Sequence, residues 1–249
     1  MELFKKDGYL VLKDFFSLEE EALIKKTGNE LFNLPEIKNS YMKYYENTSN
    51  GRILSRMEYF LNNSGDFKEL INNKVQLKLE EIVGERMCLF KDKINWKLPN
   101  GGQFKPHQDQ EAWSDFPPKY YVSCAISVDD CYVDNGCLEM VKGKHKEGIL
   151  KNTNGTIDDD VVNEMNWEYI FNTPRDLLIF DSFVPHRSDI NKTTNPRRVF
   201  YFTYNKESEG NYYEQYFAKK RRELPPDIER ESGKIYDLNS KYNLANPIS

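Results

Sequence analysis

The residues with the clearest potential for chemistry are His107 and Asp109, which are separated by one residue in the stretch Phe104-Lys105-Pro106-His107-Gln108-Asp109. In a β-strand, residues i and i+2 point to the same face and lie about 6.6 Å apart along the chain. This spacing predicts an imidazole and a carboxylate side by side on one face of a strand. An H-x-D triplet alone is a weak sign of a metal site, because such a pair is often only hydrogen-bonded.

A third candidate ligand is His186, which lies in the stretch Phe180-Asp181-Ser182-Phe183-Val184-Pro185-His186-Arg187-Ser188. Two histidines and one carboxylate on one face of an iron leave its other coordination positions open for a co-substrate and O2. A ligand set of nitrogen and oxygen without a thiolate suits non-haem Fe(II) better than structural zinc, which prefers closed, cysteine-rich sites. We therefore predict that His107, Asp109 and His186 are the metal ligands and the catalytic centre.

The composition indicates one globular domain that spans residues 1–249 and can bury a full core. The net charge of −5, without a block of Lys or Arg, argues against a nucleic-acid partner. We find no apolar run near the ~20 residues that span a membrane and no signal peptide, so we expect a cytoplasmic protein. The four cysteines form no C-x-x-C pair and are expected to be free thiols. We expect a monomer or a homodimer.

The first third of the chain is predicted to be largely helical. Residues 9–12 form a short strand, and a capping box at Ser17 opens a helix that runs to about Asn33. Residues 36–65 are polar and lack a clear period, so we expect long loops with short elements. A second helix is predicted from residue 66 to about Val83, where Gly84 ends it.

From residue 86 onward, short β-rich runs are separated by clusters of Gly, Asn, Asp and Pro, which predicts a mainly β protein with flanking helices. We expect a double-stranded β-helix, that is, a cupin-like jelly roll, at about residues 86–205, with the helical part of about residues 1–85 packed on it. Residues 151–166 are expected to form a surface loop, and a last helix is predicted at about residues 211–223. The predicted strands are 87–98, 103–108, 120–128, 137–141, 176–180 and 199–204.

Several segments together resemble the phytanoyl-CoA dioxygenase family of Fe(II)/2-oxoglutarate-dependent dioxygenases, which includes ectoine hydroxylase. The resemblance spans roughly residues 5–205. It is carried by Phe104-x-x-His107-Gln108-Asp109, by Asp134-Asn135-Gly136-Cys137-Leu138-Glu139-Met140-Val141-Lys142-Gly143-Lys144-His145, by Asp176-Leu177-Leu178-Ile179-Phe180-Asp181, by His186-x-Ser188-x-x-Asn191, and by Pro196-Arg197.

This resemblance implies Fe(II), 2-oxoglutarate and O2 as cofactor and co-substrates, with metal ligands at His107, Asp109 and His186. It also implies that Arg197, eleven residues after His186, holds the distal carboxylate of 2-oxoglutarate, because a guanidinium binds a carboxylate through two hydrogen bonds. Arg198 should point to the opposite face of the strand. Further candidates for contact with the co-substrate are Ser188, Asn95, Phe104 and Lys93.

The reaction that the resemblance implies is hydroxylation, or another oxidation, of an unactivated C–H bond with release of succinate and CO2. We expect a small polar or anionic metabolite as substrate. Residues 39–63 are expected to form a lid over the site. Candidate substrate contacts are Trp113, Arg52, Arg56, Tyr44 and Tyr45.

Two alternatives remain open. The chain could be a non-catalytic jelly-roll protein that binds a ligand and keeps a vestigial metal site, or a metal-dependent enzyme without 2-oxoglutarate. Retention of all three candidate ligands argues against the first, and Arg197 with Ser188 argues against the second.

Overall fold

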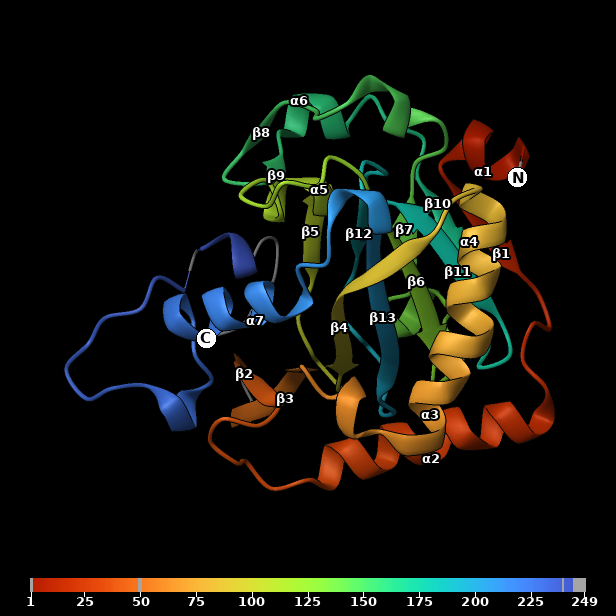
Figure 1. The fold of residues 1–249 in the computed structure, drawn as a ribbon. Helices are drawn as coiled ribbons and strands as arrows, with labels where there is room; N and C mark the ends of the chain where they lie inside the picture. The colour runs from red at the N-terminus through yellow and green to blue at the C-terminus, as the bar shows by residue number, and fades with distance from the viewer. Residues whose placement is uncertain (1, 49–50, 239, 244–249) are drawn as a thin grey trace.

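The computed structural model describes residues 2–48, 51–238 and 240–243, and its main strands form two sheets that face each other (Figure 1). The smaller sheet has the order β10 (Glu168–Ile170), β7 (Leu138–Met140), β12 (His186–Ser188) and β5 (Phe104–His107). The larger sheet has the order β1 (Tyr9–Leu12), β11 (Leu177–Asp181), β6 (Tyr121–Ser127), β13 (Arg197–Lys206), β4 (Met87–Lys97), β3 (Gly51–Glu58) and β2 (Met42–Thr48). The predicted fold class, a jelly roll with flanking helices, is confirmed.

One apolar cluster joins the two sheets, and a second joins the larger sheet to helices on its outer face. Strand β13 contributes to both clusters, because its successive side chains point to opposite faces. Val199 and Tyr201 point between the sheets, whereas Phe200 and Phe202 point to the helices. Helix α2 (Leu18–Asn33) begins at the predicted capping box of Ser17, and the other outer helix is built from three consecutive segments. These are α3 (Gly65–Leu70), the π-helical η2 (Ile71–Gln76) and α4 (Leu77–Val83), which ends at Gly84.

The remaining elements are short, apart from helix α7 (Tyr213–Glu223), which lies beside β4 (Figure 1). The segment 151–166, expected to be a surface loop, contains the hairpin of β8 (Asn152–Thr153) and β9 (Thr156–Ile157) and the helix α6 (Asp159–Val162). Ile157 and Met165 anchor it to a small apolar cluster, so that expectation was incomplete. The first helix is α1 (Glu2–Asp7), and α5 (Asp109–Ala112) follows β5. No helix within the described ranges is long and apolar enough to cross a membrane.

The expectation of long loops at residues 36–65 was wrong, because β2 and β3 form a hairpin that extends the larger sheet. The hydrophobic period fails there because the strands bury polar side chains whose partners come from other segments of the chain. Lys43 donates from Nζ to the carbonyl oxygen of Phe32 at 3.0 Å, and Glu46 accepts from the backbone N–H of Gly102 at 3.1 Å. The lid predicted at residues 39–63 assumed an irregular segment, and the hairpin removes that premise; residues 49–50 lie outside the described part.

Gly136 fixes a close approach beside the smaller sheet and gives a testable prediction. Its φ is +70°, and a Cβ added there would lie 2.3 Å from the carbonyl oxygen of Asp189. Gly148 has a similar φ of +74°, yet a Cβ there would meet nothing within 4 Å. Both Gly→Ala changes cost about 1–2 kcal/mol in the left-handed region. We expect Gly136→Ala to lower the free energy of unfolding in urea by about 1–3 kcal/mol more than Gly148→Ala; equal losses would contradict the clash.

Candidate active site

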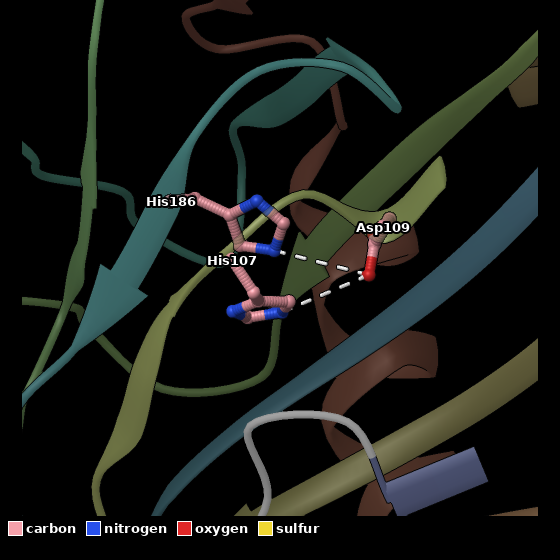
Figure 2. Close-up of side chains that lie close together, drawn as sticks. All are labelled: His107, Asp109 and His186. Atoms are coloured by element: carbon pink, nitrogen blue, oxygen red, sulfur yellow. Dashed lines mark ion pairs between the residues drawn. The ribbon is translucent and has the colours of Figure 1, made fainter. Parts of the chain in front are cut away.

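Three short elements bring the predicted metal ligands together. His107 ends β5, and His186 begins β12, directly opposite it in the antiparallel pair. The two imidazole centroids lie 4.1 Å apart. Asp109 opens α5, so the expectation that His107 and Asp109 share one strand face was wrong. Gln108, whose backbone is extended, is the N-cap of α5 and joins the strand to the helix, and the carboxylate of Asp109 lies beside both rings (Figure 2).

The geometry of these three side chains fits a metal ion. The Nε2 atoms of His107 and His186 lie 3.8 and 3.9 Å from Oδ1 of Asp109 (Figure 2). Two coordination bonds of about 2.1 Å each span up to about 4.2 Å, so each pair can share one ion. One ligand atom from each residue lies within 4.8 Å of the others, and all three residues are buried.

Backbone carbonyl groups orient both rings. The Nδ1 atom of His107 lies 2.7 Å from the carbonyl oxygen of Lys105, and Nδ1 of His186 lies 3.0 Å from that of Val184. Because a carbonyl only accepts, the neutral ring donates from Nδ1 and keeps the lone pair of Nε2 for a metal. Burial, reinforced by His186, lowers the pKa of His107 to about 3. His107 is therefore neutral, as a metal ligand must be.

One cavity beside these residues gathers every predicted co-substrate contact. Its lining includes a guanidinium, a hydroxyl, an amide and an ammonium group, which are all groups that bind carboxylates or carbonyls. Among the described residues, the buried atoms Nε of Arg197 and Oδ1 of Asn95 have no hydrogen-bond partner, so the cavity offers polar groups that a ligand can satisfy. The residues that line it are Lys93, Asn95, Phe104, His107, Asp109, Leu138, His186, Ser188, Arg197 and Tyr201.

The two adjacent arginines of β13 point to opposite faces, as predicted. Arg197 points between the sheets, whereas Arg198 forms an ion pair with Asp129 in which Nη2 lies 2.7 Å from Oδ1. The Nε of Arg198 also donates to Oδ2 of Asp129 at 2.8 Å. Only Arg197 is therefore available to a ligand in the cavity.

Lys97 was missed by sequence reasoning and lies next to the predicted Ser188. Its ammonium donates to Oγ of Ser188 at 2.7 Å and to the carbonyl oxygen of Asp189. Burial and the nearby Arg197 lower the pKa of Lys97 well below its ordinary value. The signal was present in β4, where residues 91, 93, 95 and 97 alternate onto one inward face as Lys, Lys, Asn and Lys.

A second cavity adjoins the metal-ligand cluster and shares Lys93, Phe104, His107 and Asp109 with the first. It contains the predicted Arg56 and Trp113. Its other lining residues, which sequence reasoning missed, are Lys91, Ala112, Tyr216, Lys241 and Tyr242. The lining of this cavity contains one carboxylate, that of Asp109, and four cationic side chains, those of Arg56, Lys91, Lys93 and Lys241.

Three predicted substrate contacts, Tyr44, Tyr45 and Arg52, lie outside both cavities. Tyr44 is buried, and its hydroxyl donates to the carbonyl oxygen of Leu224 at 2.8 Å. Arg52 is exposed, pairs with Asp227 and stacks on the ring of Tyr45 at 4.0 Å. All three residues lie on the β2–β3 hairpin, where other parts of the protein contact their side chains. The structure therefore does not bring them to the site.

Comparison with known proteins gives one family. The model of the phytanoyl-CoA dioxygenase family matches residues 4–199. A 2-aminoethylphosphonate dioxygenase from uncultured bacterium HF130_AEPn_1 is 37% identical, over 98% of this chain and 95% of the relative. A methylphosphonate hydroxylase from Gimesia maris is 34% identical, over 89% of this chain and 85% of the relative. The crystal structure of EctD from S. alaskensis in its apoform has the same fold, with a TM-score of 0.72 and 20% identity over 84% of this chain and 76% of that one.

Proposed function

The chain belongs to the phytanoyl-CoA dioxygenase family, and we propose that it hydroxylates an unactivated C–H bond of a small organophosphonate. The predicted family, the class of dioxygenase and the use of iron with 2-oxoglutarate and O2 are confirmed by the family match and by a cluster that can hold a metal. The non-catalytic alternative is not favoured, because the relatives are named dioxygenases and hydroxylases.

We assign the metal to His107, Asp109 and His186, which are the three described residues that converge on one point. Fe(II) bound there supplies the redox chemistry that couples the oxidative decarboxylation of 2-oxoglutarate to oxidation of the substrate. Arg197 binds the distal carboxylate of 2-oxoglutarate through its guanidinium, and the hydroxyl of Ser188 adds a further donor. Asn95, Phe104 and Lys93 complete the walls of this co-substrate cavity.

The substrate class rests on one observation: the second cavity is lined by the cationic side chains of Arg56, Lys91, Lys93 and Lys241. An anionic group bound there places its neighbouring carbon beside His107 and Asp109, which line the same cavity. Trp113 packs against Phe90 and Tyr121 at centroid distances of 5.8 and 5.0 Å, so it forms a rigid apolar wall that limits water. The names of the two relatives described above, both of which specify phosphonates, support the same class.

Succinate release tests this function. The purified enzyme is incubated with Fe(II), 2-oxoglutarate and, separately, 2-aminoethylphosphonate, methylphosphonate, β-alanine and ectoine. We expect substrate-dependent succinate with at least one phosphonate, together with a product heavier by one oxygen atom. β-Alanine is the matched control, because it carries the same aminoethyl group on a carboxylate. Turnover of ectoine or β-alanine without turnover of either phosphonate would reject the proposed substrate class.

Other assignments extend this proposal. We propose that the enzyme acts in the cytoplasm, as a monomer or a homodimer, and has no nucleic-acid partner. The absence of a disulfide among the four cysteines, all of them free thiols, supports a reducing compartment.

A further inference from the structure

A cluster of buried charged side chains around Glu58 adjoins the second cavity. The side chain of Glu58 is fully buried, and three cations surround it. Its Oε2 accepts from Nζ of Lys220 at 2.5 Å, and its Oε1 lies 3.2 Å from Nη1 of Arg56 and 3.5 Å from Nζ of Lys91. Burial opposes ionisation of Glu58, but these cations lower its pKa below the ordinary value. One carboxylate therefore forms ion pairs with three cationic side chains.

No other carboxylate of the described residues forms an ion pair with these three cations, and Glu46 attracts Arg56 only at longer range. Asp92 is next to Lys91 in sequence, yet it points to the opposite face of β4 and accepts from the backbone N–H groups of Phe60 and Leu61 at 2.8 and 3.0 Å. Asp109 also lines the second cavity and attracts Lys91, but it belongs to the metal-ligand cluster. When its groups are ionised, the cluster thus holds two more positive charges than its own carboxylate balances. This is costly in a buried site, and burial accordingly lowers the pKa of Lys91 and of Lys220.

The two cations of the cluster that line the cavity come from neighbouring strands. Arg56 of β3 lies opposite Asn95 of β4, and Lys91 lies two residues before Lys93 on the same inward face of β4. Both side chains line the second cavity, whereas Lys220 and Glu58 do not. A guanidinium and an ammonium converge there beside the metal-ligand cluster, which is the arrangement that binds an oxyanion with several acceptor atoms.

We propose that Arg56 and Lys91 form the subsite that binds the doubly charged group of the substrate, and that Glu58 and Lys220 position them. This inference rests on the proposed function, of which it names the recognition site. The ligand supplies the two negative charges that the cluster lacks, and a phosphonate carries them on three oxygen atoms. A carboxylate carries one charge on two oxygen atoms and leaves half of the excess uncompensated.

Helix α7 contributes the positioning part of the subsite. Lys220 is fully buried and lies 4.7 Å from the ring centroid of Tyr44 and 5.7 Å from that of Tyr242. Arg56 also donates from Nη1 to the carbonyl oxygen of Tyr242 at 3.1 Å. These contacts fix the two donors before a ligand arrives, which lowers the entropic cost of binding.

Calorimetric titration with methylphosphonate tests the subsite without turnover. The enzyme carries 2-oxoglutarate and Mn(II) in place of iron, and O2 is excluded. We expect Arg56→Gln and Lys91→Met each to raise the Kd by about tenfold or more, since each removes a charge-assisted contact. Arg56→Lys keeps the charge and should retain part of the affinity. Arg52→Gln is the matched control: it removes an arginine from the same strand, outside both cavities, and should leave the Kd unchanged.

Thermal unfolding separates a ligand site from a structural ion pair. If Lys91 serves the ligand, Lys91→Met removes an uncompensated buried charge and should raise the Tm of the ligand-free enzyme while it weakens binding. A lower Tm with an unchanged Kd would instead assign Lys91 a structural role and overturn the proposal. The proposal also fails if Arg52→Gln weakens binding as much as Arg56→Gln, because general surface charge would then explain the effect.

The result also distinguishes failure of the subsite from failure of the proposed substrate class. If no phosphonate is turned over, yet inorganic phosphate or methylphosphonate binds wild type and fails to bind Arg56→Gln, the subsite stands and only the assigned substrate fails. If phosphonates are turned over and the Km is unchanged in folded Arg56→Gln and Lys91→Met, the subsite is rejected and the proposed function stands.

Discussion

Replacement of His107, Asp109 or His186 by alanine is expected to abolish succinate formation. Each residue offers one ligand atom to a common point, so each deletion leaves two protein ligands for an ion that needs three. Loss of even an outer partner of a metal ligand costs about 10–100-fold in affinity or activity, so loss of a ligand itself should exceed about 100-fold. The measurements are succinate release and the iron content of the purified protein.

The fold should survive these three substitutions. The side chains border cavities and do not fill the core, so removal of any one leaves the apolar clusters intact. Urea denaturation of metal-free protein should therefore give similar midpoints for wild type and variants. Full activity in any single variant would refute the assignment of that ligand.

Arg197→Ala is expected to raise the Km for 2-oxoglutarate by about tenfold or more, because a charge-assisted bidentate contact contributes roughly 1.5–3 kcal/mol. Arg197 is buried among the residues of the co-substrate cavity, and its Nε has no partner among the described residues. Arg198→Ala is the adjacent control. Since Arg198 is engaged by Asp129 on the outer face, its loss should leave the Km for 2-oxoglutarate nearly unchanged.

Steady-state titration of 2-oxoglutarate at saturating substrate checks this pair. A larger effect of Arg198→Ala than of Arg197→Ala would mean that the inward face of β13 carries the other arginine, and the assignment of the co-substrate cavity would then be wrong.

The regular parts of the fold could be predicted from the sequence because local signals and tertiary structure agree there. The capping box of Ser17 starts α2, Gly84 ends α4, and β13 carries the continuous apolar run Val199-Phe200-Tyr201-Phe202, which is typical of a buried strand. The β2–β3 hairpin could not be predicted, because its strands bury Lys43, Glu46, Arg56 and Glu58. Their partners come from distant segments, so the pattern of apolar residues does not reveal a strand.

The candidate active site could likewise be predicted from the sequence only in part. His107, Asp109, His186 and Arg197 stand in motifs with recognisable residue types, and the structure brings all four to one place. The geometry of the His107–Asp109 pair was missed, because the strand ends at His107 and Asp109 already begins a helix. The cationic side chains of the second cavity were predicted only in part. Nothing in the sequence distinguishes Lys91 and Lys241 from other lysines, and only the folded structure shows that they line the same cavity as Arg56.

The two cavities draw their walls from different parts of the chain, and this division has a consequence for enzyme engineering. The metal ligands and Arg197 all precede residue 199, where the match to the family ends, whereas Tyr216, Lys220, Lys241 and Tyr242 follow it. Substitution confined to residues 213–243 therefore changes the part of the second cavity that Tyr216, Lys241 and Tyr242 form, without changing a metal ligand or Arg197. If this cavity binds the substrate as proposed, the C-terminal segment offers enzyme engineers a route to new substrates with the same oxidation chemistry.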